Sequence, residues 1–256
     1  MKEFRIGFFS DPHFCDKDHD NERFFRLAPA KIDRCIGAFR EAGITLAVCL
    51  GDFIDYNRDG RGALPELRLL KRKFDDSGMT LYSVLGNHDI CQLPRTVLCR
   101  ELELPCPEGY YAFTCGNWTV AALDTNYDET GRSYDTALCR WDDCYVPEVQ
   151  LMWLERVLRE APGPVLVAAH ANLDPRRIGD RMDPHVVKNH AAVRALLEKY
   201  DNVKLVMQGH YHHGCVWEYR GIPYVTLRAV VEGPSNNSAV IVILREDGNC
   251  RVEYLF

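Results

Sequence analysis

The chain has 256 residues, of which 46% are hydrophobic and 27% charged, and its formal net charge is −6. These values are typical of a soluble globular protein, and we expect residues 1–256 to form a single domain. The sequence has no basic run, which disfavours a nucleic-acid polymer as a partner. It also has no apolar stretch near twenty residues, which disfavours a membrane span. Together with the lack of a cleavable leader, this predicts a cytoplasmic location.

The first half of the chain alternates predicted strands and helices. Its strands are apolar runs, and its helices repeat apolar residues at helical spacing. Pro29 would lie inside the first helix, and Gly43 would end it. We expect strands at residues 4–9, from 46 and from 82, and helices at 23–41 and 64–74. This alternation predicts an α/β fold.

The second half is less regular. Prolines interrupt the residues that follow Asp89, and a hairpin is predicted around Gly116 and Asn117. Residues 124–146 show no periodicity but contain four aromatic side chains, which favours a functional loop over a disordered one. Helices are predicted at 147–160 and 187–199, and strands at 110–114, 118–123, from 165, from 203, 216–219, 223–227, 239–244 and 250–255.

The cysteines are eleven in number and include no C-x-x-C pair. Several lie in apolar runs, where Cys behaves as a small buried hydrophobe, so we expect reduced, structural thiols. A phosphatase with a cysteine nucleophile would need an arginine six residues after that cysteine to bind the phosphate. None of the eleven cysteines has one.

Polar side chains of metal-binding type follow five of the predicted strands. They are Asp11, His13, Asp52, Asn87, His170, His210 and His212. The carboxyl ends of strands in an open α/β sheet share one edge, so we expect these donors to meet. Seven donors suit two ions, with Asp52, alone at its strand end, as the bridge. Mixed nitrogen and oxygen donors favour Mn or Fe, and then Zn, over Ca or Mg.

Such a pair of ions has a defined chemistry. Two metals roughly 3.5–4 Å apart can clamp a phosphoryl group and hold a hydroxide between them for in-line attack. His88 follows the predicted ligand Asn87. As a cation oriented by Asp55 or Asp89, His88 would protonate the leaving alkoxide. The predicted catalytic residues are therefore Asp52 and His88.

Weaker signals come from two loops, residues 124–146 and 171–186. The candidate substrate contacts there are Tyr127, Trp141, Arg176, Arg177 and Arg181. The alternative for the arginines is a solvated face, and the alternative for the aromatic rings is packing of the loop itself. Three histidines lie in loops without a partner motif, and we expect ordinary core or surface imidazoles there: His19, His185 and His190. We expect the same of His213, which follows the G-H-x-H motif.

The ordered set D-x-H, G-D-x-x-D, G-N-H-D, a strand-end His and G-H-x-H resembles the calcineurin-like metallophosphoesterases over nearly the whole chain. The resemblance implies a four-layer α/β/β/α sandwich with two central sheets. It also implies His88 as the proton donor. The implied ligands are Asp11, His13, Asp52 and His212 for one metal, and Asp52, Asn87, His170 and His210 for the other.

Residues 221–235 resemble the end of the manganese-dependent ADP-ribose/CDP-alcohol diphosphatases, although those enzymes tend to have Gln where this chain has His13. The resemblance implies hydrolysis of a phosphodiester or pyrophosphate bond in a nucleotide-like small molecule. One alternative is a cyclic-nucleotide or glycerophosphodiester phosphodiesterase, in which the histidine is shared. Others are a non-catalytic scaffold, which would be expected to lose ligands, and a binding protein for phosphorylated ligands. No G-x-x-x-x-G-K-[ST] loop is present.

Overall fold

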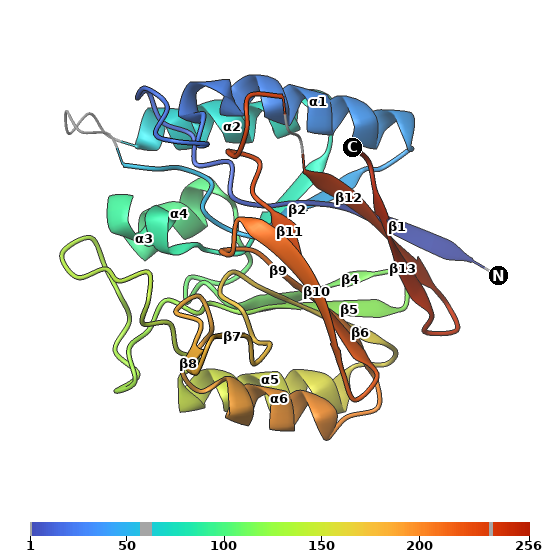
Figure 1. Ribbon diagram of the computed structural model, residues 1–256. Helices are drawn as coiled ribbons and strands as arrows, with labels where there is room; N and C mark the ends of the chain where they lie inside the picture. The colour runs from blue at the N-terminus through green and yellow to red at the C-terminus, as the bar shows by residue number, and fades with distance from the viewer. Residues whose placement is uncertain (1, 57–62, 236–237) are drawn as a thin grey trace.

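The chain is described by a computed structural model that covers residues 2–56, 63–235 and 238–256. Its elements stack in four layers, in the order helices, sheet, sheet and helices (Figure 1). The predicted α/β/β/α sandwich is therefore confirmed. Within the described residues, no helix combines the length and the apolar character needed to cross a membrane.

The first sheet combines strands from both ends of the chain. β1, β2 and β3 run parallel to one another. β12 pairs antiparallel with β1, and β13 pairs antiparallel with β12. Side chains of β1 alternate between the two faces, so that Phe8 packs between the sheets while Phe9 packs toward the helices. The strands in sheet order are β13 (Cys250–Tyr254), β12 (Ala239–Arg245), β1 (Glu3–Phe9), β2 (Leu46–Cys49) and β3 (Thr80–Ser83).

The second sheet has a parallel centre and two antiparallel edges. β11, β9, β6 and β5 are parallel, and β10 and β4 are the edges. The predicted hairpin is confirmed as the β4–β5 pair. The strands in sheet order are β10 (His213–Tyr219), β11 (Ile222–Arg228), β9 (Val203–Gln208), β6 (Val165–Ala169), β5 (Trp118–Ala122) and β4 (Tyr111–Cys115).

Four helices cover the outer faces of the sheets (Figure 1). α1 (Ala28–Glu41) and α2 (Leu64–Ser77) lie on the first sheet, and α5 (Glu148–Glu160) and α6 (His190–Glu198) lie on the second. Three apolar clusters fill the spaces between the four layers. Burial of these clusters supplies the main driving force for folding.

The first helix begins later than its periodicity predicts. Residues Phe25–Leu27 form a separate 3-10 turn, η1, and α1 starts at Ala28. Pro29 therefore lies in the first turn of α1 and not in its interior. At that position proline costs no helical hydrogen bond, because the first N–H groups of a helix have no partner within it.

Four short elements were not predicted. α3 (Asn87–Gln92) and α4 (Arg95–Glu101) follow β3, and the two-residue strands β7 (Arg177–Ile178) and β8 (Arg181–Met182) form a small ribbon in the polar loop 171–186. Elements of two to seven residues are too short to establish a periodicity in the sequence.

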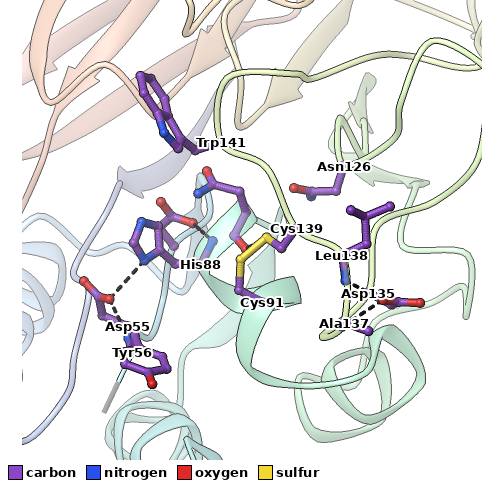
Figure 2. Close-up of a disulfide and its surroundings, with 12 residues drawn as sticks. Asp55, Tyr56, His88, Cys91, Asn126, Asp135, Ala137, Leu138, Cys139 and Trp141 are labelled. Atoms are coloured by element: carbon purple, nitrogen blue, oxygen red, sulfur yellow. Dashed lines mark hydrogen bonds and ion pairs between the residues drawn. A yellow bond between two sulfur atoms is a disulfide. The ribbon is translucent and has the colours of Figure 1, made fainter. Parts of the chain in front are cut away.

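Cys91 and Cys139 form a disulfide across a sequence separation of 48 residues. The prediction that the thiols are reduced is therefore wrong for this pair, while the other nine cysteines, all within the described ranges, form no disulfide. The bond joins α3 to loop 124–146 (Figure 2). Sequence alone gave no signal, because the pairing of cysteines cannot be deduced from their count or spacing.

Candidate metal centre

The seven predicted ligands meet at one place between the two sheets. The first sheet contributes the side chains that follow β1, β2 and β3, and the second contributes those that follow β6 and β9. Six of the seven are buried, and His212 is partly buried. Polar groups collected this deep need partners or a bound ion to offset their desolvation.

The donor atoms form three overlapping groups, each within 4.8 Å. The groups are Asp11, His13 and His212; His13, Asp52 and His88; and Asp52, His170 and His210. Oδ2 of Asp52 lies 3.4 Å from Nε2 of His13 and 3.3 Å from Nε2 of His170, so Asp52 stands between the two ends of the cluster. Oδ1 of Asn87 lies 3.1 Å from Nε2 of His170. The arrangement fits a pair of cations that share the Asp52 carboxylate.

Two of the histidines are oriented by acceptors outside the cluster. Nδ1 of His170 lies 2.8 Å from the carbonyl oxygen of Leu50, and Nδ1 of His212 lies 2.7 Å from Oε1 of Glu232. An N–H donated to each acceptor leaves Nε2 with its lone pair toward the centre. This is the arrangement that metal-binding histidines adopt.

Of the other two histidines, His13 has the same arrangement and His210 has the reverse. Nδ1 of His13 lies 3.2 Å from Oδ2 of Asp55, which again leaves Nε2 for the centre. In His210 the order is reversed, because Nε2 lies 2.9 Å from the carbonyl oxygen of Trp141. Nδ1 of His210 is therefore the nitrogen that remains available to a cation.

The backbone is strained at four of the seven positions. Asp11, His13, Asp52 and His210 have φ values of 52°, 47°, 51° and 66°, in the left-handed region. A non-glycine residue held there costs on the order of 1–3 kcal/mol, and such residues concentrate at functional sites. The strain supports a functional role for these side chains over ordinary core packing.

Two glycines create the space in which the ligands approach one another. A Cβ atom on Gly86 would collide with the side chain and the backbone nitrogen of Asp52. A Cβ atom on Gly209 would collide with Ser10 and Asp11. Glycine suits both positions because the Asp52 backbone and side chain at Gly86, and the Ser10 and Asp11 side chains at Gly209, leave no room for a Cβ atom.

The electrostatics of the cluster favour positive charge. Burial lowers the pKa of His13, but Asp52, Asp11 and Asp55 outweigh burial and raise it to about 10. Burial likewise lowers the pKa of His170, and Asp52 is the main group that raises it to about 9. A cation bound here would displace these protons, since a ligating imidazole must be neutral.

His88 stands beside the cluster with one face toward solvent. Its Nδ1 lies 3.0 Å from Oδ1 of Asp55, its backbone N–H donates to Oδ1 of Asp52 at 2.8 Å, and its side chain is 30% exposed. Of the two carboxylates predicted to orient His88, Asp55 is the one in contact. Asp89 instead accepts two backbone N–H groups, which hold the start of α3 against the segment after β2.

A cavity of about 250 Å³ opens onto the cluster. Its lining combines charged and polar side chains with the indole of Trp141. The lining residues are Arg23, Asp52, Asn87, His88, Trp141, His185, His210 and His212. Loop 124–146 therefore supplies one wall of the cavity through Trp141.

The other predicted aromatic contact lies elsewhere. Tyr127 is buried, and its ring lies beneath Arg95, whose guanidinium carbon is 5.1 Å from the ring centroid. Arg95 in turn pairs with the buried Asp124 at 2.7 Å. Tyr127 thus packs the loop, as the alternative interpretation of the aromatic residues stated.

The three predicted arginine contacts do not line this cavity either. Arg176 pairs with Asp183 at 2.7 Å and lies 3.8 Å from the ring of Tyr211. Arg177 and Arg181 are exposed on the β7–β8 ribbon. Arg177 and Arg181 thus lie on a solvated face, whereas the Arg176 side chain is only 16% exposed.

Three residues at the centre were missed. The ring of His185, expected to be ordinary, lies 4.8 Å from that of His210. Glu232 orients His212, and Arg23 lines the cavity with its Nε 3.7 Å from Glu232. Glu232 was detectable, because it lies in the segment that carries the diphosphatase resemblance; the other two residues stand in no motif.

Comparison with known proteins gives one family and several relatives. Residues 4–214 match the calcineurin-like phosphoesterase family. A manganese-dependent ADP-ribose/CDP-alcohol diphosphatase from Arabidopsis thaliana is 24% identical, covering 90% of this chain and 87% of its own length. A protein of the same name from Oryza sativa subsp. japonica is 23% identical, with 92% and 86% covered. The crystal structure of a dimetal phosphatase from Danio rerio has the same fold, with a TM-score of 0.84, 21% identity, and 98% and 95% covered.

Proposed function

This chain belongs to the calcineurin-like phosphoesterase family of metal-dependent hydrolases, and we propose that it cleaves the pyrophosphate bond of a nucleotide-like small molecule. The named activity of the Arabidopsis and rice relatives, on ADP-ribose and CDP-alcohols, supports this substrate class. The observation that carries the proposal is the meeting of seven donors from five strand ends in one cluster, whose two ends are connected through His13 and Asp52.

The proposed ligands divide into two sets. Asp11, His13, Asp52 and His212 would hold one cation, and Asp52, Asn87, His170 and His210 the other. The position of Oδ2 of Asp52 supports its role as the bridge, because this oxygen lies nearly equidistant from one imidazole of each set. When bound, the two cations would polarise the phosphoryl group and lower the pKa of the attacking water.

Manganese is the proposed native metal. Imidazole, carboxylate and amide donors together suit Mn, Fe or Zn, and the names of the two plant relatives specify manganese. The orientation of each imidazole by a fixed acceptor supports metal binding over a hydrogen-bonded core. Iron and zinc remain the competitors to be tested.

His88 is the proposed proton donor to the leaving group. It lines the cavity, and Asp55 holds its Nδ1, so that its other ring nitrogen is free to act on a bound substrate. A positioned imidazole contributes on the order of 10²- to 10⁴-fold to such a reaction. Asp52 also positions His88, because its second carboxylate oxygen accepts the backbone N–H of His88.

Trp141 and Arg23 are the proposed contacts to the rest of the substrate. Trp141 is 48% exposed and lines the cavity, so its indole is available to stack on a base. Arg23 offers a guanidinium at the same cavity, which suits the second phosphate of a diphosphate. The cavity thus combines an aromatic surface and a cation beside the proposed metals.

The test is a hydrolysis screen of the purified chain with added Mn²⁺. ADP-ribose and CDP-choline should be cleaved faster than cyclic AMP or a generic diester. Faster hydrolysis of cyclic AMP would replace the proposal with a cyclic-nucleotide phosphodiesterase. Tight binding of ADP-ribose without product would indicate a binding protein, and no binding at all would indicate a scaffold. Protein treated with EDTA and returned to Mn²⁺ is the control for metal dependence.

A further inference from the structure

The Cys91–Cys139 disulfide joins two segments that both reach the metal centre. Cys91 lies in α3, the helix that begins at Asn87 and carries His88. Cys139 lies in loop 124–146, two residues before Trp141. Figure 2 shows the disulfide between this helix and the loop, close to His88. A covalent bond therefore connects the helix of a proposed ligand to the wall of the cavity.

The loop is anchored at its ends more firmly than in its middle. Val146 and Asn189 of the neighbouring segment exchange two hydrogen bonds at the end of the loop. Residues 135–141, by contrast, form local turns. In one of them the backbone N–H groups of Ala137 and Leu138 donate to Oδ1 of Asp135. These local bonds shape the middle of the loop but do not fix it to the rest of the protein.

Cys139 and Trp141 supply the links from this middle part to the protein body. Within the described chain, the hydrogen bonds, covalent bonds and ring contacts that leave the loop from residues 135–141 start at these two residues. Sγ of Cys139 also lies 3.3 Å from the carbonyl oxygen of Asn87. The carbonyl oxygen of Trp141 accepts the Nε2–H of His210 at 2.9 Å.

We propose that the disulfide is a redox-sensitive device that positions His210 and the wall of the cavity. In the oxidised chain it holds residues 135–141 against α3, which places the Trp141 carbonyl on His210 and directs the Nδ1 of that ring toward the centre. The reduced chain lacks this link, so His210 loses its fixed acceptor and Trp141 its fixed position. The inference rests on the proposed role of His210 as a metal ligand.

The redox step requires an external dithiol. One of its thiolates attacks a sulfur of the Cys91–Cys139 bond, and its second thiol resolves the mixed disulfide. Two electrons and two protons pass to the protein, which gains two thiols while the reductant becomes a disulfide. Both cysteines are partly exposed, so a dithiol can reach the bond.

The experiment compares the oxidised full-length chain with the chain reduced by dithiothreitol, after anaerobic removal of the reductant. Thiol titration in denaturant should rise from nine to eleven groups per chain. Isothermal titration with Mn²⁺ should show about tenfold weaker binding at one site, the effect typical of losing a partner that orients a ligand. Reoxidation should restore both values.

Two variants sharpen the comparison. The double variant Cys91→Ser/Cys139→Ser should match the reduced chain and should not respond to dithiothreitol. Cys106→Ser changes a free, half-buried cysteine on another loop and should keep the full response. If the double variant does not fold, the reversible reduction of the natural chain still decides the question.

The Trp141→Ala variant distinguishes the role of the Trp141 carbonyl from the role of its indole ring. It keeps the carbonyl that His210 uses, so Mn²⁺ affinity in the oxidised variant should stay within about twofold, while reduction should still weaken it about tenfold. Complete reduction of the natural chain with unchanged Mn²⁺ affinity would overturn the inference. Mn²⁺ affinity that falls on reduction in a chain that hydrolyses no diphosphate would uphold it and refute the proposed function alone.

Discussion

Nδ1 of His88 lies 3.0 Å from Oδ1 of Asp55, and the other oxygen of this carboxylate lies 3.2 Å from Nδ1 of His13. One buried carboxylate therefore orients both the proposed proton donor and a proposed metal ligand. Burial raises the pKa of Asp55, but its close contacts with the two imidazoles more than offset burial and hold the pKa well below its usual range. Asp55 is thus an anion at any pH at which the enzyme would work.

Replacement of His88 by alanine should lower kcat about 10²- to 10⁴-fold and leave the metals in place. The loss should be greatest for substrates with a poor leaving group, because those need the proton most. Steady-state rates over a series of esters with graded leaving groups test the prediction, and metal analysis of the variant is the control. An equal loss for good and poor leaving groups would argue against the acid role.

The metal-free chain should become less stable as the pH rises. The folded-state pKa values of His13 and His170, about 10 and about 9, exceed the ordinary 6.5. Their contribution to stability is therefore complete below pH 6.5 and is lost as the pH rises through 9 and 10. Bound cations require neutral imidazoles and remove this loss.

Thermal unfolding in EDTA and in Mn²⁺ measures this effect. The difference in Tm between loaded and metal-free protein should widen steadily from pH 6.5 to 9. A difference that stays constant over this range would mean that the two imidazoles do not exchange protons for metal.

The Gly86→Ala variant should lose stability and metal together. The added Cβ would collide with Asp52, and overpacking of this kind costs typically about 1–3 kcal/mol. Gly37→Ala is the matched control, because the new Cβ would meet no atom within 4 Å and Gly37 lies inside α1. Alanine there should raise the free energy of unfolding by about 0.5–1 kcal/mol. Urea unfolding of both variants, with Mn²⁺ analysis, distinguishes a local collision from a general intolerance of substitution.

The Trp141→Ala variant should raise KM for nucleotide substrates about tenfold, which corresponds to the roughly 1–3 kcal/mol of one base stacked on an aromatic ring. KM for a diester without a base should change little. Trp141→Phe keeps an aromatic surface, so its KM for nucleotide substrates should lie between that of the natural chain and that of Trp141→Ala. An equal rise in KM for both kinds of substrate would indicate that the indole packs the loop and does not stack on a base.

Much of the fold followed from the sequence because its strands are long apolar runs. Leu166 and Val167 of β6 pack into different clusters on opposite faces of the second sheet, and a strand buried on both faces must be apolar throughout. The convergence of the candidate ligands was predictable for a related reason. A polar side chain directly after such a strand, as His170 is, has few explanations other than a site.

The features that were not predicted from the sequence depend on contacts that leave no local sequence pattern. The positive φ of His210, the bond between Cys91 and Cys139 and the approach of His185 to the cluster all arise from segments distant in sequence. The same holds for Trp141, whose carbonyl orients a histidine 69 residues away. The aromatic content of loop 124–146 predicts a functional loop, but it does not predict that the loop contacts His210.

Crystals grown with Mn²⁺ and measured at the manganese absorption edge would show directly whether the chain holds two cations that share Asp52. We expect two anomalous peaks roughly 3.5–4 Å apart, with the Asp52 carboxylate between them. One peak, or peaks distant from Asp52, would contradict it.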